Sequence, residues 1–246
     1  MREYQEHYPG AALADAVECF WTARSAAGES PHRVYPDGCV DILYIRRGSA
    51  VSLQLVGTMT AWEDVPAGAD TVALGVRFRP GTLGTRLPLL VDESADLAGV
   101  DSRLNRDVLD GLEVSLRPGA IHAAIQRLAE RCQLHDAPAR AIRYLEQQRG
   151  EVDLVWLAEQ ANLSERQFRR ICEARTGLSP KRLARTLRFR KALDLTLRTP
   201  PGGLTQVAYA CGFADQAHFT HEMRRFTGYT PGELSEIYKP HPAALP

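Results

Sequence analysis

The sequence has few cysteines, and it lacks both a long apolar run and an apolar leader. No stretch approaches the roughly 18 consecutive apolar residues of a membrane-spanning helix, so we expect no membrane association. The first residues include Glu3 and Glu6 and lack an apolar core, so we expect no secretory signal. The five cysteines are odd in number, scattered and never spaced as C-x-x-C. This usage is typical of reduced thiols in a cytoplasmic protein rather than of a disulfide framework.

The formal net charge of the chain is zero at pH 7, but the charged residues are unevenly distributed along it. Of 30 basic and 30 acidic residues, residues 1–135 hold 13 basic and 18 acidic, a net charge of −5. Residues 136–246 hold the remaining 17 basic and 12 acidic residues, a net charge of +5. Residues 164–198 alone carry 11 basic and 3 acidic residues. A basic block on a neutral protein is typical of a face that docks on an anionic surface such as nucleic acid. A merely solvated helix face is the alternative.

The first part of the chain, residues 1–117, has the pattern of short strands. The segments 40–45, 51–56 and 71–78 are rich in β-branched residues and are separated by turns that contain Gly or Pro. We therefore predict a mostly-β domain, a small antiparallel barrel or sandwich, with flanking helices. Helical spacing of apolar residues predicts a helix at residues 9–24. Short helices and loops are expected between residues 83 and 116, with residues 92–99 and 101–112 as the helical candidates.

Polar side chains cluster around two turns of this domain. The five candidates for binding a polar small molecule are Asp37, Cys39, Asp41, Arg77 and Arg79. The alternative is that Asp41 pairs with Arg77 across neighbouring strands and that Pro-Asp-Gly only forms a turn. A single histidine, His32, lies between residues 31 and 116, so we expect no metal site and no cofactor.

A connecting segment, residues 118–138, follows the strands. Its predicted helix carries apolar side chains at spacings of four, three and four residues, at Ile121, Ile125, Leu128 and Cys132. Such a seam can pair with the same helix of a second chain in a homodimer, or it can pack on the core of its own domain. The sequence leaves both arrangements open, and residues 134–138 form the predicted linker.

The last part, residues 139–246, contains two helix–turn–helix units. In the first unit Ser164 and Gln167 have the spacing of a capping box at the start of the second helix. In the second unit Asp215 is the expected N-cap of the corresponding helix. The glycines expected to end these two helices are Gly177 and Gly228. Each of these helices has an apolar stripe on one side and polar side chains on the other, which is typical of a helix that reads the DNA major groove.

The polar faces supply the residues predicted to contact DNA, because Arg and Gln match the edges of guanine and adenine. In the first unit the predicted contacts are Ser164, Glu165, Arg166, Gln167, Arg169 and Arg170. In the second unit they are Asp215, Gln216, Ala217, His218, Thr220, His221, Arg224 and Arg225. On the long basic helix between the units, residues 181–198, Lys181 and Arg185 are predicted to lie near phosphates.

Over residues 139–238 these units resemble the C-terminal domain of the AraC/XylS family of transcriptional regulators. Matching positions in the first unit are Leu157, Ala158, Ala161, Asn162, Leu163, Ser164, Phe168, Arg170 and the run Gly177-Leu178-Ser179-Pro180. Matching positions in the second unit are Ala208, Gly212, Phe213, Asp215, Gln216, His218, Phe219, Phe226, Gly228, Thr230 and Pro231. Cys172, Met223 and Leu234 stand where the family usually has an aromatic residue, a change expected to alter packing more than function.

The resemblance implies an α+β protein of two domains, in which a cupin-like sensor domain precedes a homeodomain-like, all-α domain with two helix–turn–helix units. It implies double-stranded DNA as a partner, with RNA polymerase and a small-molecule effector as further partners. The leading hypothesis is a sequence-specific transcription regulator, an activator, and not an enzyme. The alternatives are a metal-free module that binds protein partners, and a cupin-type enzyme with an attached DNA-binding domain.

Overall fold

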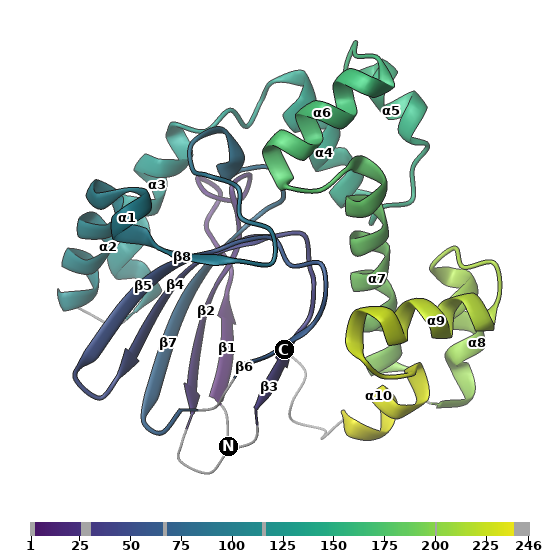
Figure 1. The fold of residues 1–246 in the computed structure, drawn as a ribbon, viewed down its shortest axis with the longest axis horizontal. Coiled ribbons are helices and arrows are strands. Elements are labelled where there is room, and N and C mark those ends of the chain that lie inside the picture. The colour runs from purple at the N-terminus through teal and green to yellow at the C-terminus, as the bar shows by residue number, and fades with distance from the viewer. Residues whose placement is uncertain (1–2, 26–30, 66–67, 115–116, 200, 239–246) are drawn as a thin grey trace.

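The computed structural model describes residues 3–25, 31–65, 68–114, 117–199 and 201–238, as a β-rich N-terminal domain and a helical C-terminal domain (Figure 1). The strands are β1 (Glu3–His7), β2 (Val17–Ser25), β3 (His32–Val34), β4 (Val40–Arg47), β5 (Ala50–Val56), β6 (Glu63–Val65), β7 (Thr71–Phe78) and β8 (Ser94–Asp96). The helices of the N-terminal domain are α1 (Leu97–Val100), α2 (Ser102–Val114) and α3 (His122–Glu130). Those of the C-terminal domain are α4 (Ala137–Gln147), α5 (Leu154–Gln160), α6 (Glu165–Thr176), α7 (Pro180–Arg198), α8 (Leu204–Ala210), α9 (Gln216–Thr227) and α10 (Pro231–Ile237).

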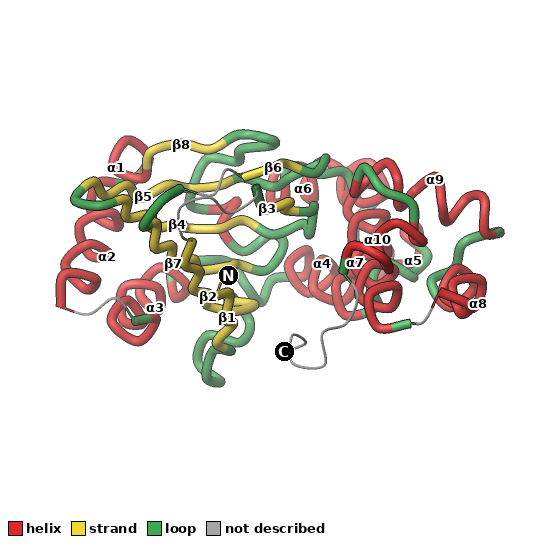
Figure 2. The backbone as a smooth tube through the Cα atoms, turned by 90° about the horizontal axis from the view of Figure 1, so that it is seen from below, coloured by secondary structure: helices red, strands yellow, loops and turns green. Residues whose placement is uncertain are grey.

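A six-stranded antiparallel sheet in the order β1-β2-β7-β4-β5-β8 forms the body of the N-terminal domain, and β3 pairs separately with β6. Strands β4 and β5 form a hairpin closed by Gly48, whose φ of 58° suits a residue without a Cβ atom. The three predicted strands are confirmed as β4, β5 and β7. Figure 2, seen from below, shows the sheet lying beside the helical domain.

One face of the sheet carries the main core of the N-terminal domain. Phe20, Leu74 and Val76 pack there against α1, α2 and α3. Apolar side chains of the predicted seam, among them Ile121 and Ile125, are buried in the same core. The seam therefore packs on its own domain rather than on a second chain.

Two of the predicted helices are wrong. Residues 9–24 form turns followed by β2, because Val17 to Ser25 pair on one side with β1 and on the other with β7. The helical spacing of apolar residues there arises from a buried turn next to a buried strand. Residues 92–99 form β8, which pairs with β5, and only the start of α1. The third prediction, residues 101–112, is confirmed by α2.

The C-terminal domain has two small cores placed along α7. Leu183 and Leu187 belong to the core of the first helix–turn–helix unit, whereas Phe189 and Ala192 belong to that of the second. The rings of Phe189 and Phe226 stack with their centroids 4.5 Å apart. Because α7 contributes to both cores, it joins the two units, which lie toward its two ends in Figure 1. None of the described helices is both long and apolar enough to cross a bilayer.

Candidate nucleic-acid interface

We call α6 and α9, the second helices of the two units, the reader helices. Helix α6 begins at a capping box in which Ser164 accepts from the Gln167 backbone N–H, and the Gln167 side chain accepts from the Ser164 backbone N–H. It ends at Gly177, whose φ of 74° lies in the left-handed region. Phe168 and Cys172 are buried, so the opposite face is turned to solvent.

The first turns of α6 carry the predicted contacts on the exposed side. Arg166 and Arg170 are exposed, and because they are four residues apart they lie on the same face of the helix. Arg169 forms an exposed ion pair with Glu173 at 3.0 Å. The remaining predicted residues of this helix are also exposed: Ser164, Glu165 and Gln167.

Helix α9 repeats this arrangement with different capping chemistry. Asp215 accepts a hydrogen bond from the His218 backbone N–H at 2.7 Å, and Gly228 ends the helix with a φ of 78°. Phe219, Met223 and Phe226 form the buried stripe that the sequence predicted. Thr220 is half-buried, and the other predicted contacts are exposed: Asp215, Gln216, Ala217, His218, His221, Arg224 and Arg225.

The two cations of α7 that were predicted to lie near phosphates differ in their surroundings. Lys181 is exposed. Arg185 instead forms a two-point ion pair with Glu222 of α9, which is only 4% exposed. Burial opposes ionisation of Glu222, but the hydrogen bond and charge of Arg185, together with the nearby His218 and Arg225, lower its pKa overall. Arg185 therefore joins α7 to the second reader helix, a role that the sequence analysis missed.

The C-terminal ends of both reader helices are held by the N-terminal domain. The hydroxyl of Thr58 donates to the carbonyl of Thr176 at 2.9 Å, at the end of α6. Arg33 donates to the carbonyl of Thr227 at 3.1 Å, at the end of α9. Figure 1 shows α6 and α9 at opposite ends of α7. The contacts therefore constrain both readers while leaving their first turns exposed.

The Arg33 contact is enclosed by aromatic rings and a carboxylate. Its guanidinium carbon lies 3.6 Å from the ring centroid of Trp62 and 4.6 Å from that of Tyr229. Asp64 accepts two hydrogen bonds from the same guanidinium, each of 2.7 Å. We call Arg33, Trp62, Asp64 and Tyr229 the arginine clamp. The bidentate ion pair with Asp64 lies within the N-terminal domain, whereas the cation–π contact with Tyr229 crosses the domain boundary.

A second contact between the domains is ionic. Arg190 of α7 donates to Glu18 of β2 at 2.7 Å. Burial opposes ionisation of Glu18, but the charge and hydrogen bond of Arg190 outweigh it and lower the pKa to about 2. The thiol of Cys39 donates to the same carboxylate at 3.3 Å. Burial raises the pKa of Cys39, so the thiol stays protonated.

The five candidates for ligand binding do not meet in one pocket. Arg77 lies 3.1 Å from Asp37 and 3.7 Å from Asp41, its partner across β4 and β7, as the structural alternative predicted. Burial raises the pKa of Asp41 to about 6 although Arg77 opposes the shift. Arg79 lies elsewhere and pairs with Glu146 of α4 at 2.7 Å. A ligand-binding role for this group stays a prediction, and its visible role is structural.

A cavity of about 700 Å³ lies on the other face of the large sheet, opposite the main core. Leu43, Ile45 and Val56 of the sheet line it together with Trp62. Gly57 and Met59 line it on either side of Thr58. The segment from Gly57 to Trp62 that borders this cavity therefore also contacts the supports of both reader helices. Thr58 binds the end of α6, and Trp62 packs on Arg33, which binds the end of α9.

In a comparison with known proteins, two separate parts of the chain match family models. Residues 157–236 match the family model of a helix-turn-helix domain, and residues 5–98 match a domain of unknown function, DUF6597. The HTH-type transcriptional activator RhaS of Escherichia coli strain SE11 is 38% identical over 86 residues, which are 35% of this chain and 31% of RhaS. RhaS of Escherichia coli O1:K1 / APEC is 37% identical over the same length.

Residues 157–236 therefore carry a helix-turn-helix domain, similar to that of the activator RhaS. The match spans about a third of RhaS, 31% of its length. For residues 5–98 the matching model carries no description of fold, so the cupin-like expectation stays a prediction.

Two solved structures are also similar to parts of this chain. The DNA-binding domain of AdpA in complex with a target DNA is 26% identical, with a TM-score of 0.39, over 42% of this chain and 94% of that one. ToxT from Vibrio cholerae O395 is 12% identical, with a TM-score of 0.48, over 89% of this chain and 98% of ToxT.

Proposed function

We propose that this protein binds a specific double-stranded DNA site through its AraC/XylS-type domain and regulates transcription. The observation that carries the proposal is the exposed N-terminal half of each reader helix, with Arg166 and Arg170 on α6 and Gln216 on α9. Helix α7 has 19 residues, so it is roughly 28 Å long. This length suits two readers that enter successive major-groove segments, roughly 34 Å apart on one face of DNA.

The activity that we propose is activation, which the activator RhaS supports through its similarity to the C-terminal domain. RNA polymerase is then a further partner, and the proposal includes no enzymatic step. The N-terminal domain is proposed to sense a small molecule or a protein partner. The support is the cavity bordered by Gly57 and Met59, because Thr58 between them contacts the first reader helix.

The test begins with selection of DNA fragments by the purified full-length protein, followed by affinity measurements on the selected site. Arg166→Ala and Arg170→Ala are each expected to weaken specific binding by about 1–3 kcal/mol. Lys181→Ala should weaken binding to all sequences and reduce the salt slope by about 1. Arg106→Ala on α2 is the control, because Arg106 is exposed on the N-terminal domain.

Two results would overturn the proposal. One is failure of the selection to enrich any sequence. The other is an affinity for the selected site that stays unchanged when Arg166, Arg170 and Lys181 are all replaced. A reporter gene placed behind the selected site separates activation from repression.

A further inference from the structure

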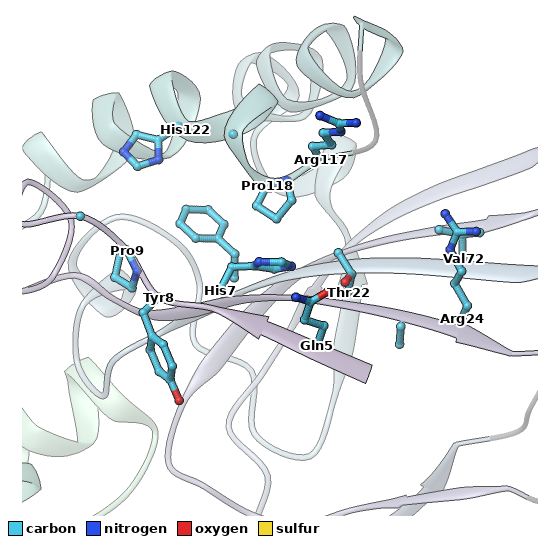
Figure 3. Close-up of a pocket in the computed structure, with 14 residues that line it drawn as sticks. Gln5, His7, Tyr8, Pro9, Thr22, Arg24, Val72, Arg117, Pro118 and His122 are labelled. Atoms are coloured by element: carbon cyan, nitrogen blue, oxygen red, sulfur yellow. The ribbon is translucent and has the colours of Figure 1, made fainter. Parts of the chain in front are cut away.

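A second cavity, which we call the strand–helix pocket, lies between the β1–β2 edge of the large sheet and the segment that leads into α3. Its volume is about 810 Å³. Figure 3 shows Gln5, His7, Thr22 and Arg24 along the strands, and Arg117, Pro118 and His122 on the facing segment. The volume falls within the usual range of pockets for small molecules.

The pocket lies where the core of the N-terminal domain ends. Phe20 is buried on the core face of β2, and its ring stacks with His122 at 5.8 Å between centroids. Thr22 and Arg24 follow at alternate positions of the same strand, so they occupy the same face as Phe20. The face is thus apolar beneath the helices and polar beyond His122. Such a boundary is typical of a binding site rather than of core.

The chemistry of the pocket lining favours an anion. Two guanidinium groups, of Arg24 and Arg117, and two imidazoles, of His7 and His122, line it. None of the residues that line it is Asp or Glu. Guanidinium groups match the planar geometry of carboxylates and the oxygens of phosphates, and they remain charged at every physiological pH. The lining residue Thr22 supplies a further hydrogen-bond donor.

We propose that the strand–helix pocket binds a small organic anion, a carboxylate or phosphate attached to an aromatic or short apolar body. Arg24 and Arg117 hold the anionic group, and Phe20, Val72 and Pro118 contact the body. The inference rests on the proposed sensor function of the N-terminal domain; it places a ligand in this second cavity and names the class of that ligand.

Helix α3 connects this pocket with the first reader helix. It begins at His122, and the chain after its end contains Gln133 and Asp136. Arg175, near the end of α6, donates to Asp136 at 2.7 Å and to the carbonyl of Gln133 at 3.4 Å. An anion that draws Arg117 and His122 toward the strands therefore acts on α3, and the segment after α3 contacts α6 through Arg175.

The experiment measures binding of defined probes to the full-length protein by titration calorimetry. The probes are benzoate, phenyl phosphate and inorganic phosphate, with neutral benzamide as the matched control. We expect benzoate or phenyl phosphate to bind and benzamide not to bind. Binding of phenyl phosphate alone identifies phosphate monoesters as the ligand class, and binding of benzoate alone identifies carboxylates as the ligand class.

Variants then locate the site. Arg24→Gln and Arg117→Gln are each expected to weaken binding about tenfold or more, because each removes a charge-assisted hydrogen bond. Arg106→Gln, an exposed arginine outside the pocket, should leave binding unchanged. The thermal unfolding midpoint without probe confirms that each variant is folded.

Three results overturn the inference: no binding of any anionic probe, equal binding of benzamide, or binding that both arginine variants retain. DNA affinity without probe is measured on the same samples. If the protein binds the anionic probes but shows no specific DNA binding, the proposed function is refuted and the pocket assignment stands. The reverse pattern refutes only the pocket assignment.

Discussion

Thr176 and Thr227 occupy the same position in the two reader helices, and each offers its backbone carbonyl to the N-terminal domain. Thr58 donates to the first carbonyl and Arg33 to the second. Each threonine precedes the glycine that ends its helix. One domain thus holds both readers at equivalent points, so any movement within it affects the placement of both readers on DNA.

The first prediction compares two glycines of the second unit. Both have positive φ, 78° at Gly228 and 66° at Gly212, so alanine costs about 1 kcal/mol of backbone strain at either position. A Cβ atom on Gly228 would also lie 2.8 Å from Arg33 and 3.1 Å from Trp62, whereas one on Gly212 meets nothing within 4 Å. We expect Gly228→Ala to lower the free energy of unfolding more than Gly212→Ala does. Chemical denaturation followed by circular dichroism measures the difference, and equal losses would show that the arginine clamp tolerates displacement.

The second prediction concerns Glu18 and Arg190. The pKa of Glu18 in the folded protein is about 2, below its ordinary value of 4.5. The stability that the pair contributes is therefore present above pH 4.5 and is lost as the pH falls toward 2. Glu18→Gln should reduce this loss and, near neutral pH, should cost up to about 3 kcal/mol because it leaves the half-buried guanidinium of Arg190 without its partner.

Denaturation at a series of pH values tests this. The control is Asp194→Asn, which removes an exposed pair with Arg198, and it should cost less than about 1 kcal/mol. If the stability of the Glu18→Gln variant depended on pH as that of the unmodified protein does, the Glu18–Arg190 pair would not be the cause of the loss at low pH.

The third prediction separates a structural from a DNA-binding role for Arg185. Arg185→Ala leaves the buried carboxylate of Glu222 unpaired, so it should lower the free energy of unfolding by about 3 kcal/mol. Adding Glu222→Gln should recover part of that loss, as a double-mutant cycle would show. Lys181→Ala is the control, because Lys181 is exposed. If Arg185→Ala kept full stability and reduced the salt slope as Lys181→Ala does, the contact would be with phosphate instead.

The fourth prediction concerns thiol reactivity. Cys39 is 2% exposed, and burial raises the pKa of its thiol. Cys132 is half-buried, and burial raises its pKa to about 11. We expect a disulfide reagent to modify Cys132 before Cys39 in the native protein, and to reach Cys39 only after denaturation. Mass spectrometry of digested samples identifies the order, and rapid modification of Cys39 would contradict the buried position.

Local signals in the sequence predicted the C-terminal domain closely. The capping box of Ser164 and Gln167 and the N-cap at Asp215 act within a few residues of the chain, and their side chains suit only a small set of conformations. In contrast, residues 9–24 were wrongly predicted to be helical, because their strand depends on partners in β1 and β7. Glu222 carried a signal that was overlooked: an acidic residue beside the buried Phe219 and Met223 needs a cation such as Arg185.

The sequence by itself determined the two helix–turn–helix units and the exposed faces of their reader helices, because caps, turns and helical periodicity depend on neighbouring residues. Only the tertiary structure decided how the N-terminal domain holds both readers, which α7 cations are already paired, and where the strand–helix pocket lies. These features join residues such as Arg33 and Thr227, which are 194 positions apart. No local pattern encodes such a contact, since it exists only after both domains have folded against each other.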